Sequence, residues 1–161
     1  MEKAFEKKQF AAEMICIINS WIDTPYRHCT KVKGRGADCA TFMVAIFEEI
    51  GVIDNFKVPY YSMDWHIHGK EDLFINNLEK FMVGINDPYS LEKINDLSPK
   101  NLSFGDWLVF AMSPLGYANH SAIYIDNGLM VHCIERVGVR MSQCLDFFPK
   151  LSMVYRLYKG A

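Results

Sequence analysis

The spacing of apolar residues along the chain changes once, near Phe104, and this change restricts the fold more than any other feature of the sequence. Before that point apolar residues recur every three or four positions, as in amphipathic helices; the clearest set is Phe10, Met14, Ile17, Ile18 and Trp21. After it, four segments are rich in β-branched and aromatic residues, as strands are: 107–112, 120–126, 129–135 and 152–159. This order predicts an α+β fold, with N-terminal helices packed on a C-terminal antiparallel β-sheet.

Three helices are expected in the first half of the chain. The first ends near Ser20, the second runs from about Asp38 to Gly51, and the third covers 71–82. The segment 54–69, which joins the second helix to the third, is aromatic and irregular, and no helical or strand period is evident in it.

The composition excludes several classes of protein. The net charge is −2, from 17 basic and 19 acidic residues, so we expect neither a nucleic-acid binder nor a protein drawn to an anionic membrane surface. The sequence has no run of about 18 apolar residues, the length that a transmembrane helix requires. The 161 residues show no repeat and no low-complexity segment, so one domain is expected over 1–161.

The N-terminal segment and the cysteines indicate where the chain is made. Glu2, Glu6 and Glu13 interrupt the apolar residues of this segment, which we therefore expect to be a helix and not a signal peptide. The five cysteines are odd in number and the chain is not small, so no disulfide framework is expected. These features predict synthesis in the cytoplasm without a signal peptide.

Cys39 is the first candidate for a chemical role. It follows the flexible segment 34–37 and directly follows Asp38, a residue that favours the N-cap of a helix. Cys39 would then lie in the first helical turn, where free N–H groups and the helix dipole stabilise a thiolate and can bind an oxyanion. The carboxylate of Asp38 opposes formation of that thiolate. The alternative is a buried structural cysteine at the start of a helix.

Two histidines lie on consecutive predicted strands that are joined by the sequence DNG at 126–128, a strong hairpin signal. A two-residue turn would place His120 and His132 on opposite faces of the sheet. A three-residue loop with Gly128 in the left-handed conformation would place them diagonally on one face, roughly 7–8 Å apart. We expect this second register, because it lets His120 act as the base for Cys39 while His132 orients the imidazole. The alternative for either histidine is a polar residue on a half-buried strand.

A metal site or a bound nucleotide is not expected. Ligands could be collected from Cys29, Cys39, His120, His132 and Cys133, but no C-x-x-C or H-E-x-x-H spacing occurs. As neighbours on a strand, His132 and Cys133 would also point to opposite faces. The sequence has no glycine-rich loop of the kind that holds phosphates, so we expect no cofactor.

Four segments, taken in order, resemble the NlpC-type cell-wall cysteine peptidases, a papain-like family. Residues 24–53 are similar to the family's Pro-Tyr turn followed by Asp-Cys on a helix, and 103–110 to its Gly-Asp before a core strand. The segments 119–125 and 130–135 resemble the strands that carry the catalytic histidine and the third polar residue. Each motif alone is weak, whereas all four in this order are specific and together span most of the chain.

The resemblance implies a papain-like fold and a hydrolase, a cysteine endopeptidase that cuts peptidoglycan stem peptides, commonly between D-glutamate and diaminopimelate. It implies Cys39 as the nucleophile, His120 as the base and His132 as the third member of the triad. The implied substrate-binding positions are Tyr26, a cleft tyrosine, and Ser121. Asp38 is a further candidate, for contact with substrate amines, and capping of the helix is the role that we favour for it. For Tyr26 the alternative is a turn tyrosine packed on the core.

Trp65, in the irregular segment, is a further candidate for the wall of the cleft; the alternative is a packed loop residue. The chain departs from the family pattern after Asp-Cys, where Ala40-Thr41 stands in place of Ser-Gly. Because of this departure, the sequence does not determine which bond is cut. The chain most resembles the single-domain peptidases of bacteriophage tails, which implies phage tail proteins as partners and a place in the virion. Two alternatives are a tail assembly protein whose cleft only binds, and an amidase or acyltransferase on the same scaffold.

Overall fold

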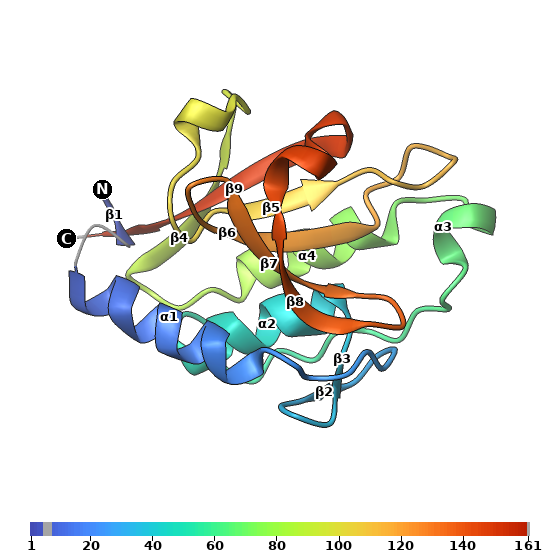
Figure 1. The fold of residues 1–161 in the computed structure, drawn as a ribbon, viewed down its shortest axis with the longest axis horizontal. Helices are drawn as coiled ribbons and strands as arrows, with labels where there is room; N and C mark the ends of the chain where they lie inside the picture. The colour runs from blue at the N-terminus through green and yellow to red at the C-terminus, as the bar shows by residue number, and fades with distance from the viewer. Residues whose placement is uncertain (5–7, 161) are drawn as a thin grey trace.

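The computed structural model describes residues 1–4 and 8–160, and helices precede most of the strands along the chain (Figure 1). The helices are α1 (Lys8–Trp21), α2 (Cys39–Glu49), α3 (Trp65–His68) and α4 (Leu73–Val83), with the 3₁₀ segments η2 (Pro99–Asn101) and η3 (Cys144–Lys150). The strands are β1 (Glu2–Lys3), β2 (Lys31–Val32), β3 (Gly36–Ala37), β4 (Tyr89–Ile94), β5 (Trp107–Phe110), β6 (His120–Asp126), β7 (Leu129–Ile134), β8 (Gly138–Gln143) and β9 (Leu151–Lys159).

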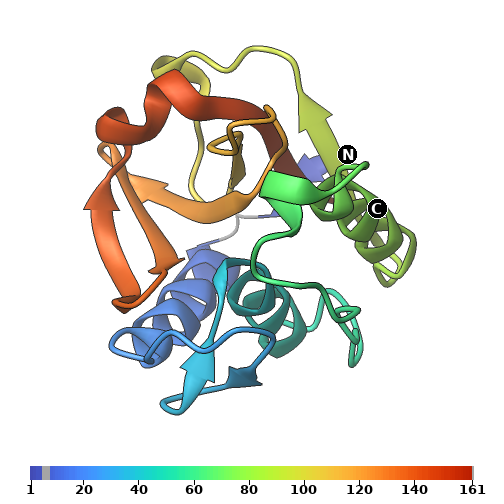
Figure 2. The same ribbon diagram turned by 90° about the vertical axis from the view of Figure 1, so that its right-hand side faces the viewer.

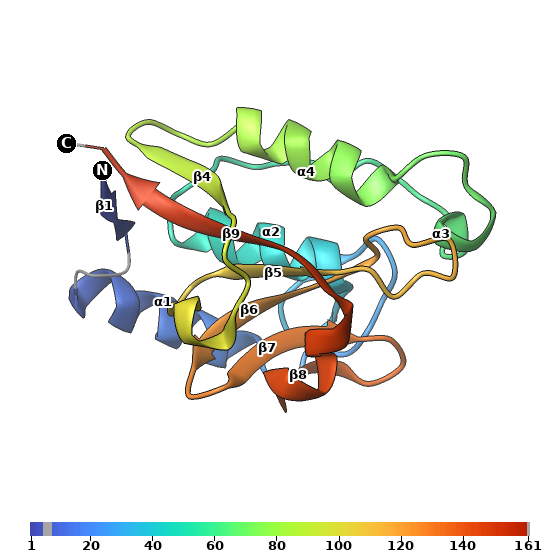
Figure 3. The same ribbon diagram turned by 90° about the horizontal axis from the view of Figure 1, so that it is seen from above.

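Seven of the strands form one antiparallel sheet. Its order is β1-β9-β5-β6-β7-β8, and β4 also pairs with β9. In Figure 2 the strands make a curved layer on one side of α1 and α2, while β2 and β3 form a separate small hairpin. Figure 3 shows α4 along the side of the molecule opposite β8. The predicted α+β fold, with helices packed on an antiparallel sheet, is therefore confirmed.

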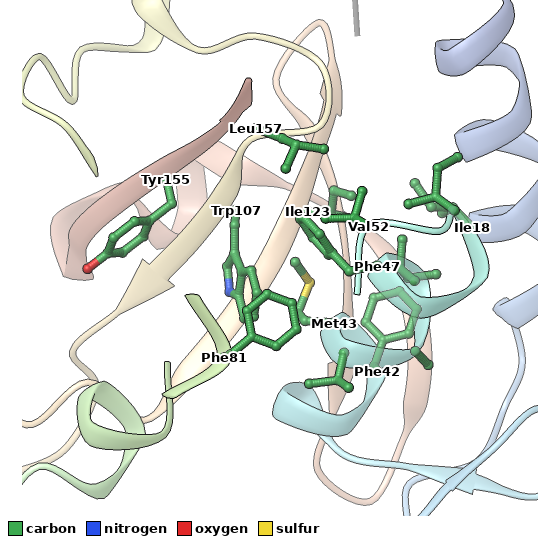
Figure 4. Close-up of a cluster of buried hydrophobic side chains, with 14 of the residues drawn as sticks. Ile18, Phe42, Met43, Phe47, Val52, Phe81, Trp107, Ile123, Tyr155 and Leu157 are labelled. Carbon is green, nitrogen blue, oxygen red and sulfur yellow. The ribbon is translucent and has the colours of Figure 1, made fainter. Parts of the chain in front are cut away.

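Both faces of the central strands are buried. Trp107 and Val109 of β5 belong to the main core between the sheet and the helices, which includes Phe47 of α2 (Figure 4). Leu108 and Phe110 point the other way, into a smaller apolar cluster that η3 helps to cover. A strand buried on both faces needs apolar residues at every position, which explains the continuous apolar sequence of β5.

Helix α2 begins and ends where the sequence predicts. Asp38 is the N-cap: its carboxylate accepts hydrogen bonds from the amides of Ala40 and Thr41, and the Thr41 hydroxyl accepts from the Asp38 amide in return. At the other end Gly51 is left-handed, with φ +80°, and the Val52 amide bonds the carbonyl of Phe47. The first of these features fixes Cys39 as the first residue of the helix.

The β6–β7 hairpin has the register that brings the two histidines to one face. Ile123 pairs with Val131 and Tyr124 with Met130, so extending the ladder puts residue 122 opposite His132. The predicted register is confirmed, but the predicted three-residue loop is wrong. Asp126 pairs with Leu129 across a two-residue turn, and the extra residue lies within β6, between residues 124 and 126, where the register shifts.

The structure adds elements that the sequence did not indicate. Strands β4 and β8 lie at the two sides of the sheet, and the short helix α3 lies within the segment 54–69 that we expected to be irregular. Within the described residues, none of the helices has the length and apolar character needed to cross a bilayer.

Candidate active site

One pocket brings together the three residues that the sequence singled out for catalysis. Cys39, His120 and His132 all line it, from the start of α2, the start of β6 and the middle of β7. His120 Nε2 lies 2.7 Å from His132 Nδ1, and Cys39 Sγ lies 3.8 Å from the carbonyl oxygen of Asn119. Because His120 uses Nε2 for this bond, Nδ1 is the imidazole nitrogen left for the thiol.

A serine that the sequence did not indicate extends the pair of histidines. His132 Nε2 lies 2.8 Å from the hydroxyl of Ser142 on β8. The two imidazoles and the hydroxyl therefore form a chain of hydrogen bonds across three neighbouring strands. Ser142 could not be found from sequence, because β8 itself was not predicted and a serine alone is not a catalytic signal.

Asp38 lies beside the nucleophile but is fully engaged with the protein. Besides capping α2, its carboxylate accepts hydrogen bonds from the amide of Cys29 and the hydroxyl of Tyr61, each at 2.7 Å. The residue is 2% exposed. The predicted capping role is confirmed, whereas contact with a substrate amine stays a prediction that would require one of these bonds to break.

The buried pocket favours neutral forms of the three residues. Burial raises the pKa of Cys39 well above its ordinary value, and the negative charge of Asp38 raises it further. Burial lowers the pKa of His120 to about 3, with His132 contributing, and burial lowers the pKa of His132 to about 4. In the free protein, burial and the charge of Asp38 therefore act against the thiolate that we expected at the helix start.

These histidine pKa values predict that the protein loses stability as the pH falls. The ordinary histidine pKa is 6.5, so between pH 6.5 and about 4 the unfolded chain binds protons that the folded histidines do not. Stability is therefore fully present above pH 6.5 and decreases by about 1.4 kcal/mol per pH unit for each histidine. Urea unfolding from pH 7.5 to 4.5 measures this slope, and His132→Asn should reduce it; equal slopes for both proteins would contradict the assignment.

The other predicted binding residues have different outcomes. Tyr26 lines the pocket, held beside the site by hydrogen bonds that join Pro25 and Arg27 to Ala37. Trp65 also lines it, is 8% exposed, and stacks on Tyr117 at 5.9 Å between ring centroids. Substrate contact by these two residues stays a prediction.

Ser121 requires a correction. It is 0% exposed, and its hydroxyl donates to the carbonyl of Cys39 at 2.9 Å. The side chain therefore points away from the pocket and ties β6 to the start of α2. The prediction that Ser121 binds substrate is wrong, because neighbouring residues on a strand face opposite sides and His120 already faces the pocket.

One group of side chains in the described residues is close enough to suggest a metal. His28, Cys29 and Asp38 have ligand atoms within 4.8 Å of one another. However, His28 Nε2 is 2.6 Å from the carbonyl of Tyr61, and Asp38 makes the hydrogen bonds given above. These hydrogen bonds anchor the loop that contains His28 and Cys29, and we assign no metal to this group of side chains.

Comparisons with known proteins support the fold. Residues 23–154 match the NlpC/P60 family. The NlpC/p60 domain of the peptidoglycan hydrolase SagA is 16% identical with a TM-score of 0.55; the match covers 89% of this chain and 96% of that one. NlpC1 from Trichomonas vaginalis is 12% identical with a TM-score of 0.64, covering 98% and 48%. The peptidoglycan hydrolase RipB from Mycobacterium tuberculosis is 17% identical with a TM-score of 0.53, covering 92% and 64%.

The chain thus spans nearly all of the SagA domain but about half of the Trichomonas protein. A comparison with curated protein sequences finds no match. At these identities the solved structures establish a shared fold, and the match to residues 23–154 includes Cys39, His120 and His132.

Proposed function

The chain belongs to the NlpC/P60 family, and from this premise we propose that it is a cysteine peptidase that hydrolyses peptide bonds in bacterial peptidoglycan. The observation that carries the proposal is the 2.7 Å bond between His120 and His132 in the pocket that also contains Cys39. This arrangement supplies a nucleophile, a base and a group that orients the base. The peptidoglycan hydrolases among the structural relatives support the choice of substrate.

The hydrogen-bond chain determines which tautomers the mechanism requires. To accept the thiol proton at Nδ1, His120 must carry its own proton on Nε2 and donate it to His132 Nδ1. His132 then carries its proton on Nε2 and donates it to the Ser142 hydroxyl oxygen. Ser142 is therefore a positioning residue: its hydroxyl can donate or accept, and it takes the acceptor role that this tautomer of His132 requires.

The reaction then proceeds through an acyl enzyme. As Cys39 Sγ attacks the carbonyl carbon of the substrate, its proton moves to His120, so that charge develops only while the bond forms. His120 returns this proton to the leaving amine when the C–N bond breaks. Water, activated by His120, attacks the resulting thioester and releases the acid and the free thiol.

An oxyanion donor follows from the capping of α2. The amides of Ala40 and Thr41 donate to Asp38 Oδ1, at 3.1 and 2.9 Å. Among the first three amides of α2, that of Cys39 is therefore the one that remains available, within the described part of the chain, to donate a hydrogen bond to a substrate oxyanion. It lies on the attacking residue itself, where a developing negative charge needs a donor.

The finer parts of the proposal rest on the four sequence segments that resemble the family. We propose that the enzyme cleaves the bond between D-glutamate and diaminopimelate and that residues 1–161 form one peptidase domain. We also propose that the protein is made in the cytoplasm and acts together with phage tail proteins. The replacement of Ser-Gly by Ala40-Thr41 beside the nucleophile makes the cleaved bond the first of these to measure.

The test is mass spectrometry of diaminopimelate-type stem peptides after incubation with the wild type and with Cys39→Ser. We expect a dipeptide ending in D-glutamate and a fragment beginning with diaminopimelate from the wild type alone. Products cut at another bond would support the proposed peptidase activity and contradict the proposed specificity. Intact stem peptides of both the diaminopimelate and lysine types, with Cys39 still reactive toward iodoacetamide, would overturn the proposed function.

A further inference from the structure

A second pocket adjoins the nucleophile on the side of α4. It shares Cys39, Tyr61, Trp65 and Asn119 with the pocket that holds the histidines. The rest of its lining comes from α2, the segment before α3, α4 and the first residue of β5. A group bonded to the sulfur of Cys39 can therefore extend in either of two directions.

The lining of this second pocket is almost entirely apolar. Beyond the shared residues, the apolar side chains of its lining include those of Val44, Phe56, Val58, Leu78, Phe81 and Trp107. Trp107 packs on Phe81, with ring centroids 5.2 Å apart (Figure 4). Stem peptides of alanine, glutamate and a diamino acid have no side chain that would fill an apolar space of this kind, so the pocket is not explained by the proposed substrate.

We propose that the second pocket binds the apolar acyl group of an ester or amide whose carbonyl is attacked by Cys39. The inference rests on the proposed role of Cys39 as the nucleophile and extends its substrates to apolar acyl donors. The S–C bond forms as the C–O or C–N bond breaks, His120 passes the thiol proton to the leaving alcohol or amine, and water then hydrolyses the thioester. The apolar chain lies among Val44, Val58 and Leu78 throughout.

The experiment measures acylation of Cys39 by 4-nitrophenyl esters of acetic, butyric and hexanoic acid, from the release of nitrophenolate and the intact mass of the protein. Burial of a methylene contributes about 0.8 kcal/mol, or roughly fourfold, so the second-order rate should rise on the order of 100-fold from acetate to hexanoate. Val58→Trp, which fills the pocket from a half-buried loop position, should remove most of this rise.

Val83→Trp is the matched control, since Val83 is 88% exposed on α4 and does not line the pocket. It should keep the full dependence on chain length. Two results would contradict the proposed acyl pocket: wild-type rates that do not change with chain length, or an increase with chain length that persists in Val58→Trp. Neither result would contradict the proposed peptidase activity. Failure of the proposed function is distinguishable, because stem peptides would then stay uncut whatever the dependence of the ester rates on chain length.

Discussion

Replacing Cys39 with serine is expected to lower the rate of hydrolysis by at least about 10⁴-fold, the largest effect that we expect on activity. Burial lowers the pKa of His120 to about 3, so the base is weak, and a thiol gives up its proton to such a base far more readily than a hydroxyl does. A serine hydroxyl is far less acidic. Initial rates on the stem peptide cut by the wild type measure the loss, and activity within tenfold of the wild type would rule out Cys39 as the nucleophile.

The fold should not change with this substitution. Cys39 is half-buried and its backbone is fixed by Asp38 and Ser121, so the free energy of unfolding should stay within about 1 kcal/mol of the wild type. Cys16→Ser, which removes an exposed thiol on α1, is the matched control and should keep full activity. Because burial raises the pKa of Cys39, its alkylation rate should continue to increase with pH up to pH 9, with no plateau in the acid range.

The largest expected effect on stability is that of Asp106→Leu, about 3–5 kcal/mol of the free energy of unfolding. Asp106 is 0% exposed and binds Arg156 through two bonds, from Nε at 2.7 Å and from a terminal guanidinium nitrogen at 2.8 Å. Arg156 is 6% exposed, so the substitution would leave a buried guanidinium whose remaining partners, the carbonyl of Asn101 and the side chain of Tyr158, supply no carboxylate. Urea unfolding at pH 7.5 measures the loss.

Two further variants separate burial from charge in this prediction. The double variant Asp106→Leu, Arg156→Met should recover part of the loss, because it removes the unpaired charge. Asp23→Asn, which breaks the exposed pair between Asp23 and Arg140, should cost less than about 1 kcal/mol. An Asp106→Leu protein as stable as Asp23→Asn would contradict the structural role of the buried pair.

The parts of the fold that could be predicted are those with a strong local signal. Helix α2 has a capping residue, an apolar face and a terminal glycine, and strands β6 and β7 are apolar runs around an Asn-Gly turn. Strands β4 and β8 were missed because they lie toward the sides of the sheet, where several residues face solvent and the sequences YSLEKI and GVRMSQ lack a continuous apolar pattern.

The candidate site was predictable to a similar extent. The order of Cys39, His120 and His132 was sufficient to place them in one pocket, because the hairpin register and the start of α2 follow from the sequence. The buried position of Ser121 could also have been inferred from the alternation of side chains along a strand. The bond to Ser142 and the direction of the pKa shifts could not, since both depend on how closely separate elements pack.

The extra residue in β6 has a consequence for how such genes can change in length. His120 and His132 are twelve positions apart, and with a two-residue turn both side chains lie on one face only because the strand accommodates one surplus residue between 124 and 126. A gene lacking the codon for that residue would encode a regular ladder with both histidines still on one face, now eleven positions apart. Two proteins whose histidines differ in spacing by one codon can therefore share the same catalytic geometry.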